Sequence, residues 1–358
     1  MTSWTPLAWF AAAYVAAAVV TAWLVGWAAS LGVIDRPNSR SSHTRATPRG
    51  GGLAIVGVTS WAAIIAGALH ADARAPLAAV LVPALAIATV SWLDDLRPLQ
   101  NRVRFGVHLA AAVAAVALLG PVKTVNLGAL GHFELGLAAW PLTLLWIVGM
   151  TNAFNFMDGI DGIAGITAAA AGGAIAAAAG LLGLEPLALV SLAFAAASAG
   201  FLACNWPPAR IFMGDVGSAF CGFMIAVLPL AGGGGAAAPL VLVAAVTMWP
   251  FIFDTAFTLC RRLSRRENVF EAHRSHLYQR LVIAGWSHRA VSSLYGGLSA
   301  MAAMIAVAPL AGLCPERTAT NLAAATVLVG AVMLLVLVHL ASAASAVQAE
   351  GRKPSGAP

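Results

Sequence analysis

Long apolar stretches separated by short polar ones follow one another along almost the whole chain. A helix needs about 20 apolar residues to cross the hydrocarbon layer of a membrane, and eleven stretches approach or reach that length. They span residues 7–31, 51–70, 76–93, 105–120, 138–155, 163–182, 187–203, 216–231, 236–259, 290–311 and 320–343. The pattern predicts an all-α polytopic membrane protein with about eleven transmembrane helices. We expect one integral membrane domain over 1–343, followed by a polar, disordered tail over 344–358.

The composition indicates the same class of protein. Hydrophobic residues make up 60% of the 358 residues and charged residues only 9%, whereas soluble domains carry about 25% charged residues. A soluble fold and a disordered chain are therefore both excluded. The four cysteines are widely separated and form no CxxC motif, so neither a zinc site nor a redox pair is expected. No Lys or Arg precedes the apolar run 7–31, which favours a retained helix over a cleaved signal peptide.

The basic residues fall on alternate loops. If each stretch crosses the membrane once, one face holds the segments 32–50, 94–104, 156–162, 204–215, 260–289 and 344–358. These segments contain all 20 Lys and Arg residues except Arg74, Lys123 and Arg317. The positive-inside rule assigns that face to the cytoplasm, so we predict a periplasmic N-terminus and a cytoplasmic C-terminus. This topology accounts for the net charge of +6 without a nucleic-acid partner, and on the other face the alternation in 121–137 predicts a small hairpin.

A first basic loop, DRPNSRSSHTRATPRGGG, precedes the second apolar stretch. The guanidinium groups of Arg45 and Arg49 suit phosphate oxygens, and the three glycines that follow let backbone approach a ligand. The alternative is a solvated loop that only obeys the positive-inside rule.

Two adjacent carboxylates, Asp94 and Asp95, end the third stretch in the segment SWLDDLRPLQNRVRF, and Arg102 and Arg104 follow them. Such a pair can offer oxygens to Mg²⁺, or one carboxylate can act as a base. A helix end with local Asp–Arg pairs is the structural alternative.

Polar side chains recur every three positions in TNAFNFMDGIDG, at Asn152, Asn155, Asp158 and Asp161. On a continuing helix they form one stripe of amides and carboxylates, which suits a cation or a nucleotide base. Further along, FMGDVGS places Asp215 among glycines at the start of another stretch. A carboxylate there is typical either of a functional group or of a helix N-terminal cap.

A second basic loop, EAHRSHLYQR, brings His273, Arg274 and His276 together. Histidine can exchange charge near neutrality, and Arg274 can clamp phosphate. The spacing does not match a zinc motif, and the alternative is a basic loop that touches anionic lipid. Asp254, seven residues before Arg261, is explained as well by a structural contact as by catalysis, and the other histidines are not expected to be catalytic.

Hard oxygen ligands, arginines and two histidines thus gather on one face of a membrane protein. Mg²⁺ commonly binds through one or two carboxylates together with substrate phosphates. Phosphoryl transfer needs mainly positioning and charge neutralisation. The constellation therefore suits a reaction between a soluble diphosphate and a lipid-borne phosphate.

In this order, the motifs DD, NAFNFMDGIDG and FMGDVGS, with the two basic loops, resemble the polyprenyl-phosphate N-acetylhexosamine-1-phosphate transferases of glycosyltransferase family 4. This family includes phospho-N-acetylmuramoyl-pentapeptide transferase and the initiating transferases of O-antigen synthesis. The resemblance implies transfer of sugar-1-phosphate from a UDP-N-acetylhexosamine to undecaprenyl phosphate, with release of UMP. It also implies a multi-pass protein of the bacterial inner membrane that uses Mg²⁺, with Mn²⁺ as an alternative ion, and it leaves a homodimer open.

The resemblance also implies roles for individual residues. Asp215 matches the metal ligand, assisted by Asn155, and the paired acids Asp94 and Asp95 match groups debated between metal binding and deprotonation. Asp158 and Asp161 match positions that line the uridine and diphosphate site. His273 and His276 match the catalytic histidine-rich loop. The expected substrate-binding residues are Arg45, Arg49, Arg102, Asn152, Asn155 and Arg274.

Three other classes fit the sequence less well. A CDP-alcohol phosphotransferase would carry Ala-Arg after its DG, and DGIDGIAG has no such Arg. An intramembrane prenyltransferase would show two Asp-rich motifs, and only one DD exists. A transporter or flippase would place charges near the middle of its spans rather than at helix ends.

Overall fold

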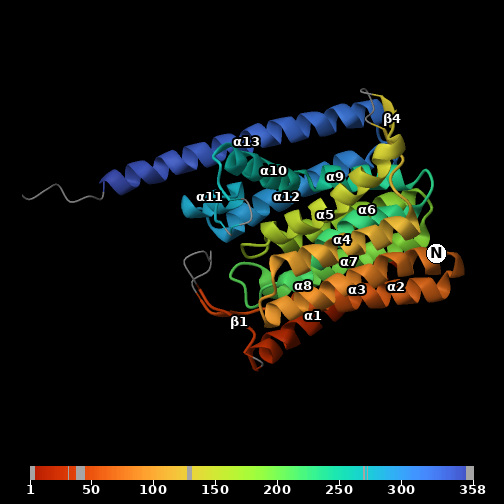
Figure 1. The fold of residues 1–358 in the computed structure, drawn as a ribbon, viewed down its shortest axis with the longest axis horizontal. Helices are drawn as coiled ribbons and strands as arrows, with labels where there is room; N and C mark the ends of the chain where they lie inside the picture. Colours follow the sequence, from red (N-terminus) through yellow and green to blue (C-terminus); the bar gives the residue numbers. More distant parts are fainter. Residues whose placement is uncertain are drawn as a thin grey trace, which may run out of the picture.

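The computed structural model is a bundle of helices whose long axes run roughly side by side (Figure 1). It describes residues 5–30, 32–37, 45–126, 131–268, 271 and 273–351. The α-helices are α1 (Thr5–Ser30), α2 (Gly52–Leu69), α3 (Arg74–Leu96), α4 (Asn101–Leu119), α5 (Ala139–Met157), α6 (Ile163–Leu181), α7 (Glu185–Asn205), α8 (Asp215–Val227), α9 (Ala237–Thr247), α10 (Trp249–Ser264), α11 (Leu277–Ile283), α12 (His288–Val307) and α13 (Glu316–Gly351). The 3-10 helices are η1 (Ala71–Ala73), η3 (Gly136–Ala138) and η4 (Leu228–Gly232).

Hydrophobic length confirms the predicted class of protein. Within the described ranges, ten helices are long and apolar enough to cross a membrane, or up to eleven if α9 and α10 form one broken span. The stretch 236–259 was predicted to be continuous, and the structure corrects this with a bend of 67° between the two helices. Pro250 lies in the first turn of α10, where its ring and missing N–H prevent the preceding helix from continuing.

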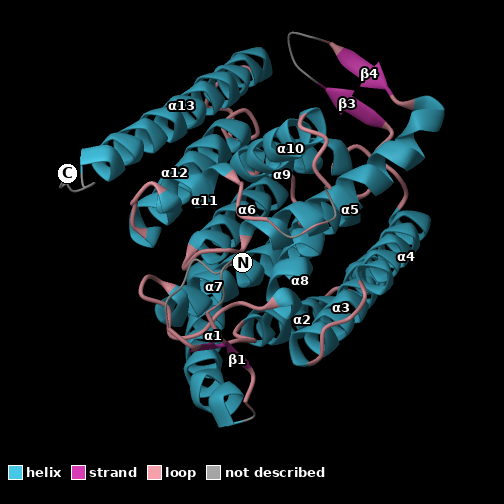
Figure 2. Cartoon of the chain, turned by 60° about the vertical axis from the view of Figure 1, so that its left-hand side comes forward, coloured by secondary structure: helices cyan, strands magenta, loops and turns pink. Residues whose placement is uncertain are grey.

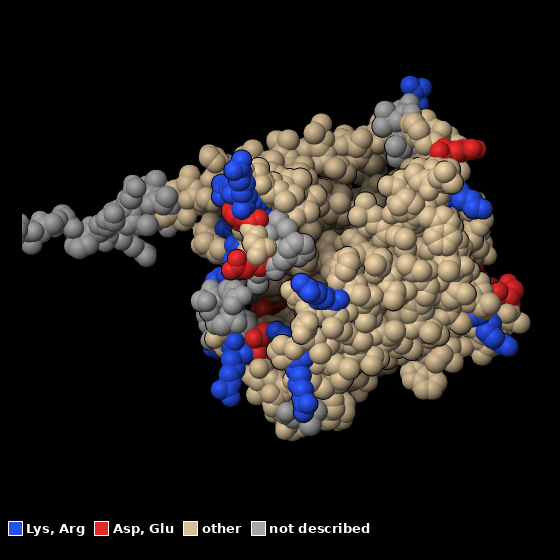
Figure 3. Space-filling view, viewed as in Figure 1, with Lys and Arg blue, Asp and Glu red and all other residues tan. Residues whose placement is uncertain are grey.

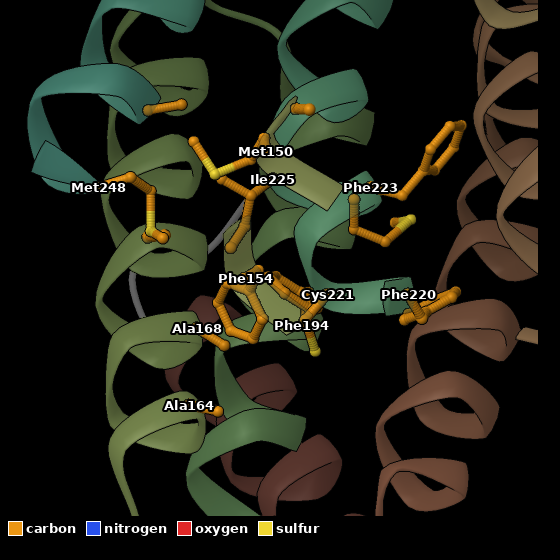
Figure 4. Packing of buried hydrophobic residues seen from close by; sticks show 14 of the residues in the cluster. Met150, Phe154, Ala164, Ala168, Phe194, Phe220, Cys221, Phe223, Ile225 and Met248 are labelled. Atoms are coloured by element: carbon orange, nitrogen blue, oxygen red, sulfur yellow. The ribbon is translucent and has the colours of Figure 1, made fainter. Parts of the chain in front are cut away.

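The short helix α8 lies at the centre of the bundle. All of its residues after Asp215 are buried. Its Cys221 packs with Phe154 of α5 and Phe194 of α7, and all three side chains are fully buried (Figure 4). The close packing of α8 depends on glycine, because a Cβ on Gly52 of α2 would collide with the backbone of Gly217. A buried central helix fixes the position of whatever its first residue carries, and that residue is Asp215.

The ends of the bundle carry the charges. On the face drawn in Figure 3, Lys, Arg, Asp and Glu gather toward the two ends and leave a broad uncharged belt between them, as expected for a membrane protein. The N-terminus lies at one end of the bundle and the C-terminal end of α13 at the other, while α1 and α13 occupy opposite edges (Figures 1 and 2). Which end faces the cytoplasm remains a prediction from the Lys and Arg distribution.

Two antiparallel strand pairs complete the fold. β1 (Ile34–Asp35) pairs with β2 (Thr47–Pro48) beside the start of α2. β3 (Thr124–Asn126) pairs with β4 (His132–Glu134), which confirms the hairpin predicted within 121–137. Asn126 of this hairpin donates a hydrogen bond of 2.7 Å to Glu316 at the start of α13.

The C-terminal segment differs from its prediction. We expected residues 344–358 to be disordered because they are polar, but α13 continues to Gly351. The prediction was wrong for 344–351, because alanine and glutamine have high helix propensity even where the pattern is no longer apolar. Residues 352–358 lie outside the described residues.

Candidate active site

The candidate site is built around the start of α8. The carboxylate of Asp95, at the end of α3, accepts two hydrogen bonds of 3.0 Å, from the backbone N–H groups of Asp215 and Val216. The first N–H groups of a helix have no partner within the helix, so Asp95 supplies the cap of α8 from 120 residues away. Gly214 adopts φ +77°, and a Cβ there would lie 2.7 Å from Asp95 Oδ2. The sequence left open that Asp215 caps its own helix, and the structure instead gives that role to Asp95.

Asp215 keeps a partly exposed carboxylate, with 28% of the side chain accessible. Its Oδ1 accepts a hydrogen bond of 3.2 Å from the amide nitrogen of Asn155, which also donates to Ser218 Oγ at 2.8 Å. The structure thus brings together the two residues that the resemblance gave as a metal site. In this arrangement the nitrogen of Asn155 faces Asp215, so the amide orients the carboxylate.

Arg104 connects the paired acids to Asp215. Its Nη1 lies 2.6 Å from Asp94 Oδ2 and 3.1 Å from Asp215 Oδ2. The other oxygen of Asp94 accepts a hydrogen bond of 2.6 Å from the backbone N–H of Leu99. The local Asp–Arg pair that the sequence offered as an alternative is therefore present, and it belongs to the site.

Arg102 was expected to bind substrate, but the structure does not bring it to the cluster. Arg102 is exposed and makes no hydrogen bond or ion pair within the described part of the chain. Sequence reasoning passed over Arg104 as a site residue. The missed signal was periodicity, because Arg104 precedes the buried His108 and Ala112 at four-residue intervals on α4, whereas Arg102 falls on the outer face.

Arg49 reaches the same cluster from the first basic loop. Its Nη2 lies 2.6 Å from Asp35 Oδ2 and its Nη1 3.4 Å from Asp95 Oδ1. Backbone pairing holds the loop in place, because Phe212 N–H donates to Pro48 O and Gly50 N–H donates to Phe212 O. Arg45, the other arginine predicted to bind substrate from this loop, is exposed at the rim.

The four polar residues predicted to form one helical stripe do not do so, because α5 ends before Asp158. Asp158 follows the last residue of α5, and its half-buried carboxylate has no hydrogen-bond partner among the residues that the structure describes. The pKa of Asp158 is raised to about 7, chiefly by burial and then by the nearby carboxylate of Asp215. Asn152 lies one turn earlier and donates to Val148 O of its own helix at 2.7 Å.

Asp161 contacts two other segments of the chain, and both of its carboxylate oxygens have partners. Its Oδ2 accepts a hydrogen bond of 3.0 Å from Ala209 N–H, and its Oδ1 lies 3.4 Å from His288 Nδ1. Its backbone oxygen accepts a bond of 2.7 Å from Ser292 Oγ. His288, which we did not expect at the site, therefore positions the turn after α5, and no local sequence pattern signalled it.

The histidine loop docks onto the end of α5. Tyr278 Oη donates a hydrogen bond of 3.1 Å to Phe156 O, and Gly159 leaves no room for a Cβ beside that hydroxyl. The rings of His273 and His276 lie 5.0 Å apart. The pKa of His273 is lowered to about 4, chiefly by burial and to a smaller extent by the neighbouring His276, Arg262 and Arg261. Arg274, between the two histidines, is half-buried.

The donor set suits one hard divalent cation bound with substrate. No group of three or more His, Cys, Asp or Glu side chains with metal-holding geometry occurs among the described residues. Mg²⁺, however, commonly takes one or two carboxylates and fills its remaining positions with water and substrate phosphate. Asp215 is partly exposed, and the carboxylate of Asp158 has no hydrogen-bond partner among the described residues. These two carboxylates fit the ion.

Comparison with known proteins adds independent information. Residues 77–233 match the family model described as glycosyl transferase family 4. The chain is 33% identical to the probable undecaprenyl-phosphate N-acetylglucosaminyl 1-phosphate transferase of Bacillus subtilis, over 73% of each chain. It is 31% identical to the decaprenyl-phosphate N-acetylglucosaminephosphotransferase of Mycolicibacterium smegmatis, over 79% of this chain and 78% of the relative. It is 28% identical to the undecaprenyl-phosphate alpha-N-acetylglucosaminyl 1-phosphate transferase of Yersinia pestis, over 78% of each.

Proposed function

This chain belongs to glycosyl transferase family 4, and on that premise we propose that it transfers N-acetylhexosamine-1-phosphate from a UDP-sugar to undecaprenyl phosphate. The products are undecaprenyl-diphosphate-sugar and UMP. The names of the relatives support this reaction type, since they are polyprenyl-phosphate N-acetylglucosamine-1-phosphate transferases. We place the reaction in the bacterial inner membrane, as the first membrane step of O-antigen or a related surface polysaccharide.

The observation that carries the proposal is the cluster at the start of α8. Asp215 lies at the end of an apolar helix bundle, within reach of Arg104 and Asn155, and Asp95 fixes its backbone. A soluble diphosphate can approach this end of the bundle from water, while a lipid-borne phosphate can approach from the membrane. The cluster contains the anionic ligands and cationic side chains that phosphoryl transfer needs.

Bond changes follow from this pairing of substrates. An oxygen of the lipid phosphate attacks the β-phosphorus of the UDP-sugar, and the bond between that phosphorus and the bridging oxygen breaks. The electron pair leaves with UMP, and the sugar remains on the transferred phosphate. A phosphate monoester has a second pKa near 6, so the attacking lipid phosphate is largely dianionic at neutral pH and needs no protein base.

The paired acids are accordingly assigned to positioning. Both oxygens of Asp95 are occupied by the N–H groups of α8, and both oxygens of Asp94 by Leu99 N–H and Arg104. Neither is an open base in this arrangement. We propose that Asp95 holds Asp215 in place and that Asp94 orients Arg104.

The remaining residues divide into a cation site and a phosphate site. Asp215 and Asp158 would hold Mg²⁺, with Mn²⁺ as the alternative, and the ion when bound neutralises diphosphate oxygens. Arg104 and Arg49 offer guanidinium groups to the phosphates from either side of the acids. Arg274 and the two histidines of its loop face the donor from the end of α5.

Release of UMP by the purified protein in detergent tests the proposal. The assay supplies undecaprenyl phosphate and a panel of UDP-N-acetylhexosamines, including 6-deoxy sugars, with Mg²⁺ or with EDTA. We expect UMP only when lipid, donor and Mg²⁺ are all present, and the fastest donor identifies the sugar. UMP release that does not require the lipid, or none from any donor by folded protein, contradicts the proposal.

A further inference from the structure

Asp254 is a fully buried carboxylate in the middle of α10, and the proposed reaction gives it no role. Its Oδ1 accepts a hydrogen bond of 2.8 Å from the backbone N–H of Leu277. Its Oδ2 accepts bonds of 3.0 Å from Tyr278 N–H and 2.7 Å from Tyr295 Oη. A buried carboxylate is strongly unfavourable unless it is fully hydrogen-bonded, and here the donors come from the start of α11, from α12 and from Thr258 of α10, whose Oγ1 donates to Oδ1 at 3.3 Å.

His276 is the side chain that this carboxylate orients. Its Nδ1 lies 3.1 Å from Asp254 Oδ1. Backbone N–H groups can only donate, so both oxygens of Asp254 act as acceptors, and this donor pattern assigns the ring proton to Nδ1. The hydrogen bond at one ring nitrogen determines what the other nitrogen offers. In the neutral ring with its proton on Nδ1, the lone pair is on Nε2, the ring nitrogen that does not face Asp254.

The loop that carries His276 is attached to the candidate active site at a second point. Tyr278, two residues later, donates from its hydroxyl to Phe156 O. Phe156 adjoins Asn155, whose amide orients the carboxylate of Asp215. Asp254 binds the same short segment from the opposite side, through Leu277 and Tyr278 N–H. The segment from His276 to Tyr278 is thus held between Asp254 of α10 and the end of α5.

We propose that Asp254 is a positioning residue for the transferase reaction. It fixes the Nδ1–H tautomer of His276 and holds the start of α11, which leaves Nε2 as the ring atom that contacts the sugar-diphosphate donor. This inference rests on the proposed function, because that donor is the molecule that His276 would meet. Asp254 itself acts only through His276, since its side chain is enclosed.

A double-mutant cycle tests the proposal, with UMP release as the assay. Asp254→Asn keeps the shape of the side chain, but an amide can accept at only one of the two positions. In one orientation its NH2 group points at Tyr278 N–H, and in the other it points at Leu277 N–H. Loss of a carboxylate that orients a metal-bound histidine lowers activity by about 10- to 100-fold, and by analogy we expect a loss of about that size in kcat/KM. In a His276→Ala background, Asp254→Asn should cause no more than about a twofold further loss.

A matched control separates positioning from general destabilisation. Tyr295→Phe removes one hydrogen bond from the same carboxylate on the side away from His276, and we expect kcat/KM within about twofold of the unsubstituted enzyme. Independent losses for Asp254→Asn and His276→Ala, or equal losses for Asp254→Asn and Tyr295→Phe, would overturn the proposal. An active enzyme with such results refutes only this inference, whereas absence of UMP from the unsubstituted enzyme refutes the proposed function.

The ring proton can also be observed without a functional variant. Nitrogen NMR of protein labelled with ¹⁵N-histidine, with the His276 signals assigned by their loss in His276→Ala, distinguishes the two neutral tautomers. We expect a protonated Nδ1 and an unprotonated Nε2 in the unsubstituted protein. The opposite tautomer would contradict the inference, even if Asp254→Asn fails to fold and whatever the outcome of the activity assay.

Discussion

The cap that Asp95 provides to α8 makes a quantitative prediction. Asp95→Ala removes the acceptor of two backbone N–H groups, those of Asp215 and Val216, in a place where the Asp95 side chain is fully buried. Loss of a helix cap lowers the free energy of unfolding by about 1 kcal/mol, and each buried N–H left without a partner costs about 1–3 kcal/mol. The two N–H groups together give a loss of about 2–6 kcal/mol, and because the cap value describes the same hydrogen bonds with solvent admitted, about 1 kcal/mol is the lower bound if water enters the vacated space.

Activity should fall together with stability, because the same hydrogen bonds hold Asp215. Thermal unfolding in detergent, followed by tryptophan fluorescence, measures the stability, and UMP release measures the activity. We expect Asp95→Ala and Asp95→Asn both to lower the unfolding temperature and to lower kcat. Asp72→Asn is the control, since Asp72 is an exposed aspartate in η1 and its replacement should change neither.

A base at this position would behave differently. If Asp95 removed a proton during the reaction, Asp95→Asn would abolish activity and leave the unfolding temperature unchanged. That result would refute the assignment of Asp95 to positioning.

Three further predictions concern other residues of the site. Arg104→Ala should lower kcat/KM by at least about tenfold, because it removes the guanidinium group that pairs with Asp94 and Asp215. Arg102→Ala should leave kcat/KM within about twofold of the unsubstituted enzyme. Equal losses of UMP release in the two variants would contradict this difference between the two arginines. Asp215→Asn should abolish UMP release while the unfolding temperature is kept, and full turnover at ordinary Mg²⁺ would refute the metal role. The pKa of Asp158 is raised to about 7 in the folded protein from 3.8, so folding favours the protonated carboxyl and stability is lost as pH rises from about 4 to 7. In Mg²⁺-free buffer Asp158→Asn should therefore raise the unfolding temperature at pH 8 but not at pH 4, and an equal effect at both would contradict the raised pKa.

The membrane spans could be predicted because lipid imposes a strong constraint on the chain. Backbone groups in the hydrocarbon must pair within each helix, so apolar length alone located the spans. The break between α9 and α10 was not predicted, although Pro250 marks it, because the apolar pattern continues across it. The C-terminal end of α13 was missed for the converse reason, since polarity is not by itself a signal that a helix ends.

The sequence predicted which motifs meet at the site, but it did not predict which residues contact one another there. Alternation of loops places the acids and arginines at one end, and the contacts of Asp215 with Arg104 and Asn155 confirm that they meet. The role of Asp95 depends on a backbone contact 120 residues away, which no local pattern contains. The choice of Arg104 over Arg102 depends on the rotation of α4 about its axis, which only the packed structure fixes.

The fate of the β-phosphate of the donor tests the central claim most directly. A UDP-N-acetylhexosamine labelled with ³²P in its β-phosphate is incubated with purified protein, undecaprenyl phosphate and Mg²⁺, and lipid and water phases are then separated. Transfer of sugar-1-phosphate predicts that the label moves into the lipid and that the nucleotide product is unlabelled UMP. Label that stays in the water phase as UDP while sugar enters the lipid would show ordinary glycosyl transfer and would contradict the account.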